Sequence, residues 1–142
     1  MTFSAAERPL YTVEEARMLS GLQLAYVGDS VYDLLVRTYL MRSGCRVHEM
    51  HRMATERVNA VSQAKAAESV LKKLTEEETL IVKRGRNAHP HHSVPRAATV
   101  GDYALATGLE ALLGFLYLTG QDERLYRIFA LLEESRTCPE RT

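Results

Sequence analysis

The stretch Leu24-Ala25-Tyr26-Val27-Gly28-Asp29-Ser30-Val31-Tyr32 places one carboxylate inside an otherwise apolar segment. The surrounding apolar residues recur at helical spacing and predict a helix over 21–42, apolar on nearly every side and therefore central in the fold. Asp29 lies within one stripe of this helix, formed by Leu22, Ala25, Asp29, Tyr32 and Val36. Gly28 comes directly before it, and a glycine that weakens a helix here indicates a close approach by another backbone.

A second predicted helix, 101–118, shows the same anomaly. Between Asp102 and Asp122 the only charged residue is Glu110. Its helical stripe contains Tyr103, Thr107, Glu110, Leu113, Gly114 and Tyr117. The small residues Gly108, Ala111 and Gly114 leave room for a neighbouring backbone.

A carboxylate on an apolar helical face is costly unless it is paired or binds a metal. Asp29 and Glu110, on two different buried helices, therefore suggest a shared cation, and ligands that offer only oxygen favour Mg²⁺ or Mn²⁺. The alternative is that each carboxylate pairs with an arginine or sits at an exposed edge, and the pattern leaves both interpretations open. Asp33 could share the face of Asp29, but Arg37 one turn further favours a surface Asp33–Arg37 pair.

The remaining sequence predicts an all-α fold, because helix caps are frequent and sustained apolar–polar alternation is absent. We expect helices over 12–19, 21–42, 48–74, 76–85, 101–118 and 122–135. The charged residues of 48–74 are expected to form a solvated face. Gly85 is expected to end its helix in a left-handed conformation. The stretch 86–100 is then the one long loop, and loops of that length in compact domains are usually functional.

Length and charge limit the class of protein. The chain has 142 residues, which suits a single domain over 1–142 with its own core. No apolar run could cross a bilayer and the start lacks the layout of a signal peptide, so we expect a cytoplasmic protein that does not enter membranes. The formal net charge is zero, which argues against a general nucleic-acid coat protein.

The charge is nevertheless unevenly distributed. No acid occurs between Glu78 and Asp102, whereas this segment contains Lys83, Arg84, Arg86 and Arg96 together with His89, His91 and His92. A neutral protein with one basic segment can bind a polyanion on one face. The histidines lack the spacing of a zinc site, and we expect them to contribute weak positive charge or polar contacts beside that polyanion.

Three motifs, in order, resemble one family. The stretch 24–32 resembles the signature helix of the ribonuclease III catalytic domain, and 107–118 resembles its second catalytic helix. Between them, Lys83-Arg84-Gly85-Arg86-Asn87-Ala88 is similar to a loop motif of Mini-ribonuclease III, the short bacterial branch without a double-stranded-RNA-binding domain. The resemblance covers about 22–118. It implies an all-α homodimeric endonuclease that hydrolyses double-stranded RNA with Mg²⁺, Mn²⁺ being a possible substitute, and that matures the large-subunit (23S) ribosomal RNA precursor.

On this resemblance, Asp29 and Glu110 take the places of the catalytic, metal-binding acids of the two helices. Lys83, Arg84, Arg86 and Asn87 are the candidates for RNA contacts. Longer ribonuclease III enzymes have further acids where this chain has Leu22, Ala25 and Thr107, which leaves the number of bound metals open. The apolar signature helix also exceeds what one monomer easily covers, so we expect a homodimer with contacts near Leu22, Ala25 and Tyr26.

Two other functions remain as alternatives. One is a non-catalytic RNA-binding or ribosome-assembly module on the same fold, and the missing acids favour it. The other is a helical dimerisation protein without an RNA role, against which the acid-free basic segment argues. The exact cleavage site, and whether ribosomal proteins on the substrate assist, do not follow from the sequence.

Overall fold

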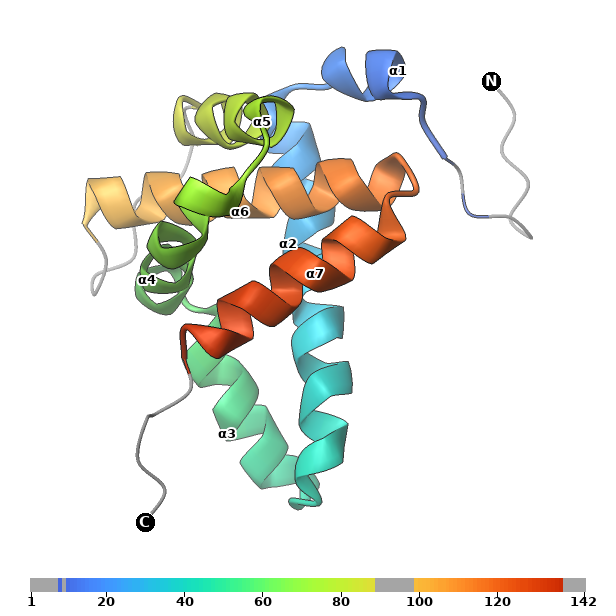
Figure 1. The fold of residues 1–142 in the computed structure, drawn as a ribbon. Helices are drawn as coiled ribbons and strands as arrows, with labels where there is room; N and C mark the ends of the chain where they lie inside the picture. The colour runs from blue at the N-terminus through green and yellow to red at the C-terminus, as the bar shows by residue number, and fades with distance from the viewer. Residues whose placement is uncertain (1–7, 9, 89–98, 137–142) are drawn as a thin grey trace.

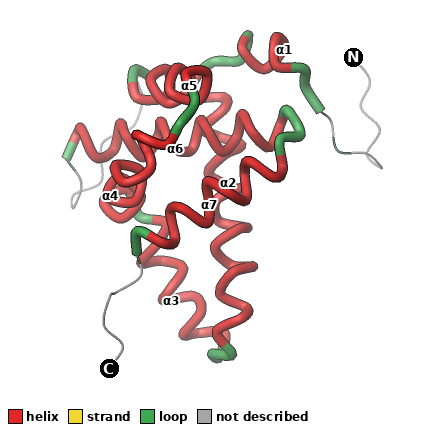
Figure 2. Tube along the Cα trace, in the orientation of Figure 1, coloured by secondary structure: helices red, strands yellow, loops and turns green. Residues whose placement is uncertain are grey.

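The computed structural model describes residues 8, 10–88 and 99–136, and every regular element in this part of the chain is helical (Figure 2). The all-α prediction is therefore confirmed. In chain order the elements are α1 (Val13–Arg17), α2 (Gly21–Leu40), η1 (Met41–Ser43), α3 (Val47–Val58), α4 (Ala60–Val70), η2 (Leu71–Lys73), α5 (Glu76–Arg86), α6 (Val100–Leu118) and α7 (Asp122–Glu134). None of these helices combines the length and the apolar character needed to cross a membrane.

Helix α6 is the centre of the molecule. It packs against α2, α4, α5 and α7, with α2 crossing behind it and α7 lying in front in Figure 1. Most of its side chains are buried, Leu109, Leu113 and Phe115 among them, because neighbours cover it on several sides. Glu110 is thus placed in the interior helix of the fold.

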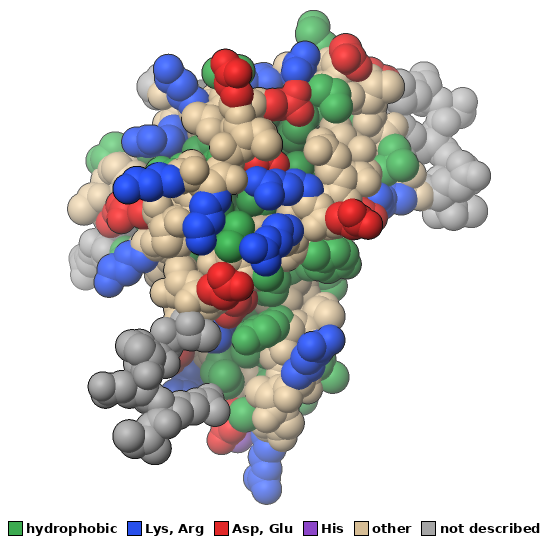
Figure 3. Space-filling view, in the orientation of Figure 1, with side chains coloured by type: hydrophobic (Ala, Val, Ile, Leu, Met, Phe, Trp, Pro, Cys, Tyr) green, Lys and Arg blue, Asp and Glu red, His purple; other side chains and the backbone are tan. Residues whose placement is uncertain are grey.

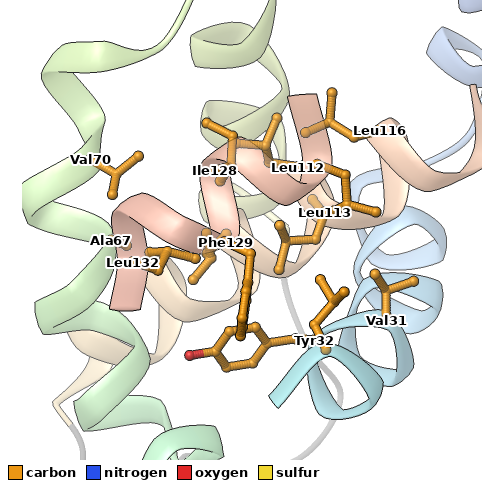
Figure 4. Close-up of a cluster of buried hydrophobic side chains, with 14 of the residues drawn as sticks. Val31, Tyr32, Ala67, Val70, Leu112, Leu113, Leu116, Ile128, Phe129 and Leu132 are labelled. Atoms are coloured by element: carbon orange, nitrogen blue, oxygen red, sulfur yellow. The ribbon is translucent and has the colours of Figure 1, made fainter. Parts of the chain in front are cut away.

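The core between α2, α6 and α7 is built from large apolar side chains (Figure 4). Tyr32 and Phe129 meet edge to face with their ring centroids 6.1 Å apart. Leu113 and Leu132 are fully buried around them. The Tyr32 hydroxyl accepts a hydrogen bond of 2.7 Å from Arg136. Burial raises the pKa of Tyr32 to about 12, so the phenol is neutral at physiological pH.

Side-chain caps define the starts of two helices. Thr12 with Glu15, and Thr75 with Glu78, form complete capping boxes in which side chain and backbone bond reciprocally. These two caps fix where α1 and α5 begin.

The single helix predicted over 48–74 is wrong, because the chain breaks at Asn59. This residue is extended, with φ −75° and ψ 153°, and its side-chain oxygen accepts from the Ser62 amide at 2.9 Å. Asn59 therefore caps a new helix, α4. The solvated face is confirmed, because the charged residues expected on it are exposed: His48, Arg52, Glu56, Lys65, Glu68, Lys72 and Lys73. Other residues of α4 pack against α6, and Gln63 is buried among them.

The expected left-handed end at Gly85 is wrong as well. Gly85 lies within α5, and in the described residues positive φ angles occur only at Gly44 and Gly120. A Cβ atom at Gly85 would be 2.7 Å from the Gly108 Cα atom. The glycine is therefore needed for close packing of α5 against α6.

Charged side chains of both signs are interspersed on the face where α7 lies in front (Figure 3). Two acids that are buried near α7 have arginine partners. Both Glu78 oxygens accept from Arg124 at 2.8 Å, and Glu133 pairs with Arg57 at 3.2 Å. These acids are neutralised within the fold, unlike the two on α2 and α6.

Candidate active site

An open cleft of about 500 Å³ lies where α2, α6 and the start of α4 meet. Asp29 and Glu110 both line this cleft, as the sequence predicted for a shared site. Its other lining residues are Leu22, Ala25, Tyr26, Val58, Asn59, Ala60, Gln63, Tyr103, Ala106 and Thr107.

A glycine contact between the two main helices brings the acids together. A Cβ atom at Gly28 would be 1.6 Å from the Glu110 carbonyl oxygen, and one at Gly114 would be 2.0 Å from the Leu24 carbonyl oxygen. Side chains at either position would force the backbones apart. The predicted close approach at Gly28 and Gly114 is confirmed, and it sets the neighbouring Asp29 opposite Glu110.

The site favours the protonated form of Glu110. Burial, a hydrogen bond with Asp29 and the Asp29 charge together raise the pKa of Glu110 to about 9. Glu110 is half-buried, whereas Asp29 is exposed. The expectation that both acids are buried is therefore wrong for Asp29, which lies at the cleft rim. Desolvation followed by the charges of Glu110 and Asp29 also raises the pKa of Tyr103, which places its hydroxyl in the same cluster.

The alternative of arginine pairing does not apply within the described part of the chain. There, neither Asp29 nor Glu110 forms an ion pair with lysine or arginine. Asp33 does pair with Arg37, at 3.2 Å and on the surface, as predicted. Two adjacent acids without a positive partner are destabilised when both ionise.

A hard divalent cation fits this arrangement. Two facing carboxylates supply oxygen ligands, and a cation between them would offset both the desolvation and the repulsion that favour protonated Glu110. Among residues 10–88 and 99–136, no third histidine, cysteine, aspartate or glutamate joins them. Leu22, Ala25 and Thr107, where longer enzymes are expected to have acids, line the cleft instead.

Two cleft residues were missed by sequence reasoning. Gln63 was not singled out in the predicted helix 48–74, yet it is only 2% exposed. Asn59 was placed inside a long helix, although asparagine is a preferred helix cap and Ser62 three positions later supplies the amide it binds. That cap was the available signal for the break that directs α4 to the cleft.

The basic candidates lie apart from the acids. Lys83, Arg86 and Asn87 line a second hollow of about 500 Å³, between the end of α5 and the start of α6. Arg84 does not join them, because its guanidinium donates to the backbone carbonyls of Arg17, at 3.0 Å, and Leu19. Its bonds tie α5 to the segment between α1 and α2. Arg96, His89, His91 and His92 lie outside the described residues.

Comparison with known proteins identifies the family. The Ribonuclease III domain model matches residues 22–121. A Mini-ribonuclease 3 of Desulfitobacterium hafniense is 44% identical over 117 residues, covering 82% of this chain and 73% of that protein. That of Enterococcus faecalis is 45% identical over 116 residues, covering 80% of this chain and 87% of the relative. A Fusobacterium nucleatum protein of known crystal structure superposes with a TM-score of 0.76 at 32% identity, covering 84% and 96% of the two chains. The chain belongs to the ribonuclease III family and resembles its Mini-ribonuclease 3 members.

Proposed function

We propose that this ribonuclease III-family endoribonuclease uses Mg²⁺ to cleave double-stranded RNA, and that its substrate is the precursor of the large-subunit (23S) ribosomal RNA. The observation that supports this most is the facing pair of Asp29 and Glu110, which share a cleft and form no ion pair with any lysine or arginine in the described part of the chain. The fold accommodates this costly pair at the crossing of its two principal helices, which is typical of a functional site.

Asp29 and Glu110 are the residues that would hold the ion. When bound, a divalent cation supplies positive charge for the scissile phosphate and makes a water acidic enough to attack it. Glu110 presents its carboxyl group from the interior side of the cleft, and Asp29 presents its own from the rim. Leu22, Ala25 and Ala106 form apolar parts of the wall, which reduce competition from bulk water. We expect products with 5′-phosphate and 3′-hydroxyl ends.

Duplex RNA would be held by its phosphates and its shape. A-form RNA offers few base edges to side chains, so recognition depends on the backbone and the 2′-hydroxyls. Lys83, Arg86 and Asn87 have no side-chain hydrogen bond or ion pair with another described residue, so they could make such contacts from the hollow beside α6. With zero net charge on the chain, few phosphate contacts are available, and ribosomal proteins already bound to the precursor would help to select the site.

We also propose a homodimer formed through α2. Tyr26 is 84% exposed and Leu34 is 64% exposed on this helix, and both line a hollow with Val27 and Tyr117. Of the expected contacts, Ala25 is only 8% exposed, so Tyr26 and Leu34 are the better candidates. The paired Tyr26→Ser and Leu34→Ser substitutions should convert a dimer to a monomer in sedimentation experiments. A wild-type monomer that cleaves RNA would contradict the dimer.

The test of cleavage compares three substitutions on one duplex substrate. Asp29→Asn and Glu110→Gln each remove one cleft charge at nearly constant shape, and both should abolish Mg²⁺-dependent cleavage. Asp33→Asn is the matched control, because Asp33 is on the same helix but pairs with Arg37, and it should cleave normally. Cleavage by Asp29→Asn at the wild-type rate would refute the site.

A non-catalytic RNA-binding module remains the second candidate. It is favoured by the apolar or neutral residues at Leu22, Ala25 and Thr107, which leave two acids in the cleft. The same assay separates the two functions. Wild-type protein that binds duplex RNA and leaves it intact at every Mg²⁺ and Mn²⁺ concentration would support the binding module.

A further inference from the structure

The side chain of Gln63 presents an unexplained polar group in the cleft. It is only 2% exposed, and its buried Nε2 atom has no hydrogen-bond partner among the residues that the structure describes. Gln63 nevertheless lines the same cleft as Asp29 and Glu110. Buried amide groups almost always have partners, so an unpaired one beside a functional site indicates that its partner arrives with a ligand or a change of charge.

The backbone holds this amide in place from two sides. Asn59 caps α4 through the Ser62 amide, so Gln63 lies in the first turn of that helix. Helix α4 packs against α6, the helix that contains Glu110. The other buried residues of α4 are small and apolar: Ala64, Ala66, Ala67 and Val70. A leucine or methionine at position 63 would suit this packing, so the glutamine is not needed for packing alone.

We propose that Gln63 is a positioning residue that donates a hydrogen bond from its side-chain amide to the ionised Glu110 carboxylate when a divalent cation is bound. This inference rests on the proposed function, since it requires the cation site at Asp29 and Glu110. An amide nitrogen can only donate, and the cleft offers carboxylate oxygens as acceptors. Glu110 is the closer match of the two acids, because it is half-buried and its helix packs directly on α4.

The hydrogen bond would have two consequences. It would stabilise the charged form of Glu110, which the cation requires, and it would fix the direction of the carboxylate. Partners of this kind typically change metal affinity about 10- to 100-fold. Without such a bond, the buried Gln63 amide nitrogen has no acceptor among the described residues.

The first experiment measures Mn²⁺ binding by calorimetry to the RNA-free protein, for wild type and three variants. Gln63→Leu removes the donor at similar volume and should weaken binding about 10-fold, with the melting temperature preserved. Val70→Ala is the structural control, because Val70 is also 2% exposed on α4 but does not line the cleft. It should lower the melting temperature and leave the Mn²⁺ affinity unchanged. Asp29→Asn should abolish binding.

The second experiment follows the Gln63 side-chain amide directly by NMR, assigned as the signal that Gln63→Leu removes. Saturation with diamagnetic Mg²⁺ should shift this signal and slow its exchange with water. Gln63→Leu affinity within twofold of wild type, together with an unmoved amide signal, would overturn the inference while the Asp29→Asn result still supports the cation site. Wild-type protein that binds no Mn²⁺ would overturn the proposed function and this inference with it.

Discussion

The substitution Gly28→Ala tests whether the crossing of α2 and α6 creates the site. An added Cβ atom would be 1.6 Å from the Glu110 carbonyl oxygen and 2.9 Å from the Gly114 amide nitrogen, whereas real Cβ contacts are not shorter than 3.0 Å. Both atoms belong to the backbone, so no side-chain rotation can relieve the clash. The helices must separate by about 1.4 Å at this point, the difference between 1.6 and 3.0 Å.

The magnitude follows from the kind of contact that is lost. Overpacking a core with one extra carbon costs about 1–3 kcal/mol, and a clash between two backbones should reach at least the upper end. A loss of about 3 kcal/mol corresponds to roughly 10 °C in Tm for a chain of this size. The same displacement moves Glu110 away from Asp29, and a 1 Å error in catalytic geometry can cost about 100-fold in rate.

The assay combines chemical denaturation with duplex RNA cleavage. Gly101→Ala is the matched control, because among the described residues a Cβ there meets only Thr99 Oγ1, at 3.8 Å, and alanine favours a helix by about 1 kcal/mol. It should be as stable as wild type or slightly more so, with normal cleavage. A Gly28→Ala protein within 1 kcal/mol of wild type and fully active would refute the crossing argument.

Three further predictions concern charged residues. The pKa of Glu110 is raised in the folded state, so without metal its ionisation should cost stability as pH rises from about 4.5 towards about 9. Glu110→Gln should abolish that loss and show a higher Tm than wild type at pH 8 in a chelator. Desolvation alone would raise the pKa of Glu78, but hydrogen bonds from Arg124 and the Thr75 backbone outweigh it and lower the pKa. The ionised Glu78 therefore stabilises the folded protein above the unfolded pKa, and this stabilisation is lost as acid protonates the carboxylate. Glu78→Gln should cost about 3 kcal/mol at pH 7, and its unfolding curves should depend less on pH below 4.5. Arg86→Ala should weaken duplex binding and flatten the slope of log affinity against log salt by about one unit. Arg84→Ala should mainly lower Tm, because Arg84 binds backbone carbonyls. Equal salt slopes for Arg86→Ala and wild type would contradict an RNA contact at Arg86.

The sequence predicted the centre of the site because its signals were local and unusual. An acid within an apolar helical stripe is costly where the helix is buried, and this pattern indicated Asp29 and Glu110. The glycines at 28 and 114 then indicated which faces meet. The exposure of Asp29 could not be predicted from the sequence. Helical periodicity shows which residues share a stripe, but not how far neighbouring helices cover that stripe, and Asp29 lies at its exposed edge.

The errors arose where two physical roles share one residue type. A glycine can end a helix or allow two helices to pack closely. Gly85 has the second role because Gly108 of α6 lies against it, which is a tertiary contact that the local sequence does not specify. An arginine can bind RNA phosphates or backbone carbonyls. Arg84 binds the carbonyls of Arg17 and Leu19, and their position beside α5 depends on the tertiary path of the chain. Asn59 looked like one polar residue among many in a charged helix, so the break that places Gln63 was missed.

Helix α6 lies between the acidic cleft and the basic hollow and contributes residues to both. Gly108 on α6 touches α5, where a Cβ atom would be 2.7 Å from the Val82 carbonyl oxygen, and Gly114 touches α2. Glu110 lies between these two backbone contacts, so the segment around it cannot slide towards either neighbour without a clash. Rigid secondary structure of this kind holds functional groups more accurately than loops do. Because α5 also presents Lys83 and Arg86, the two glycine contacts set the distance from the acidic cleft to the basic hollow. A substitution at Gly108 should therefore impair RNA binding and cleavage together, although Gly108 has no side chain that could contact the RNA or a cation.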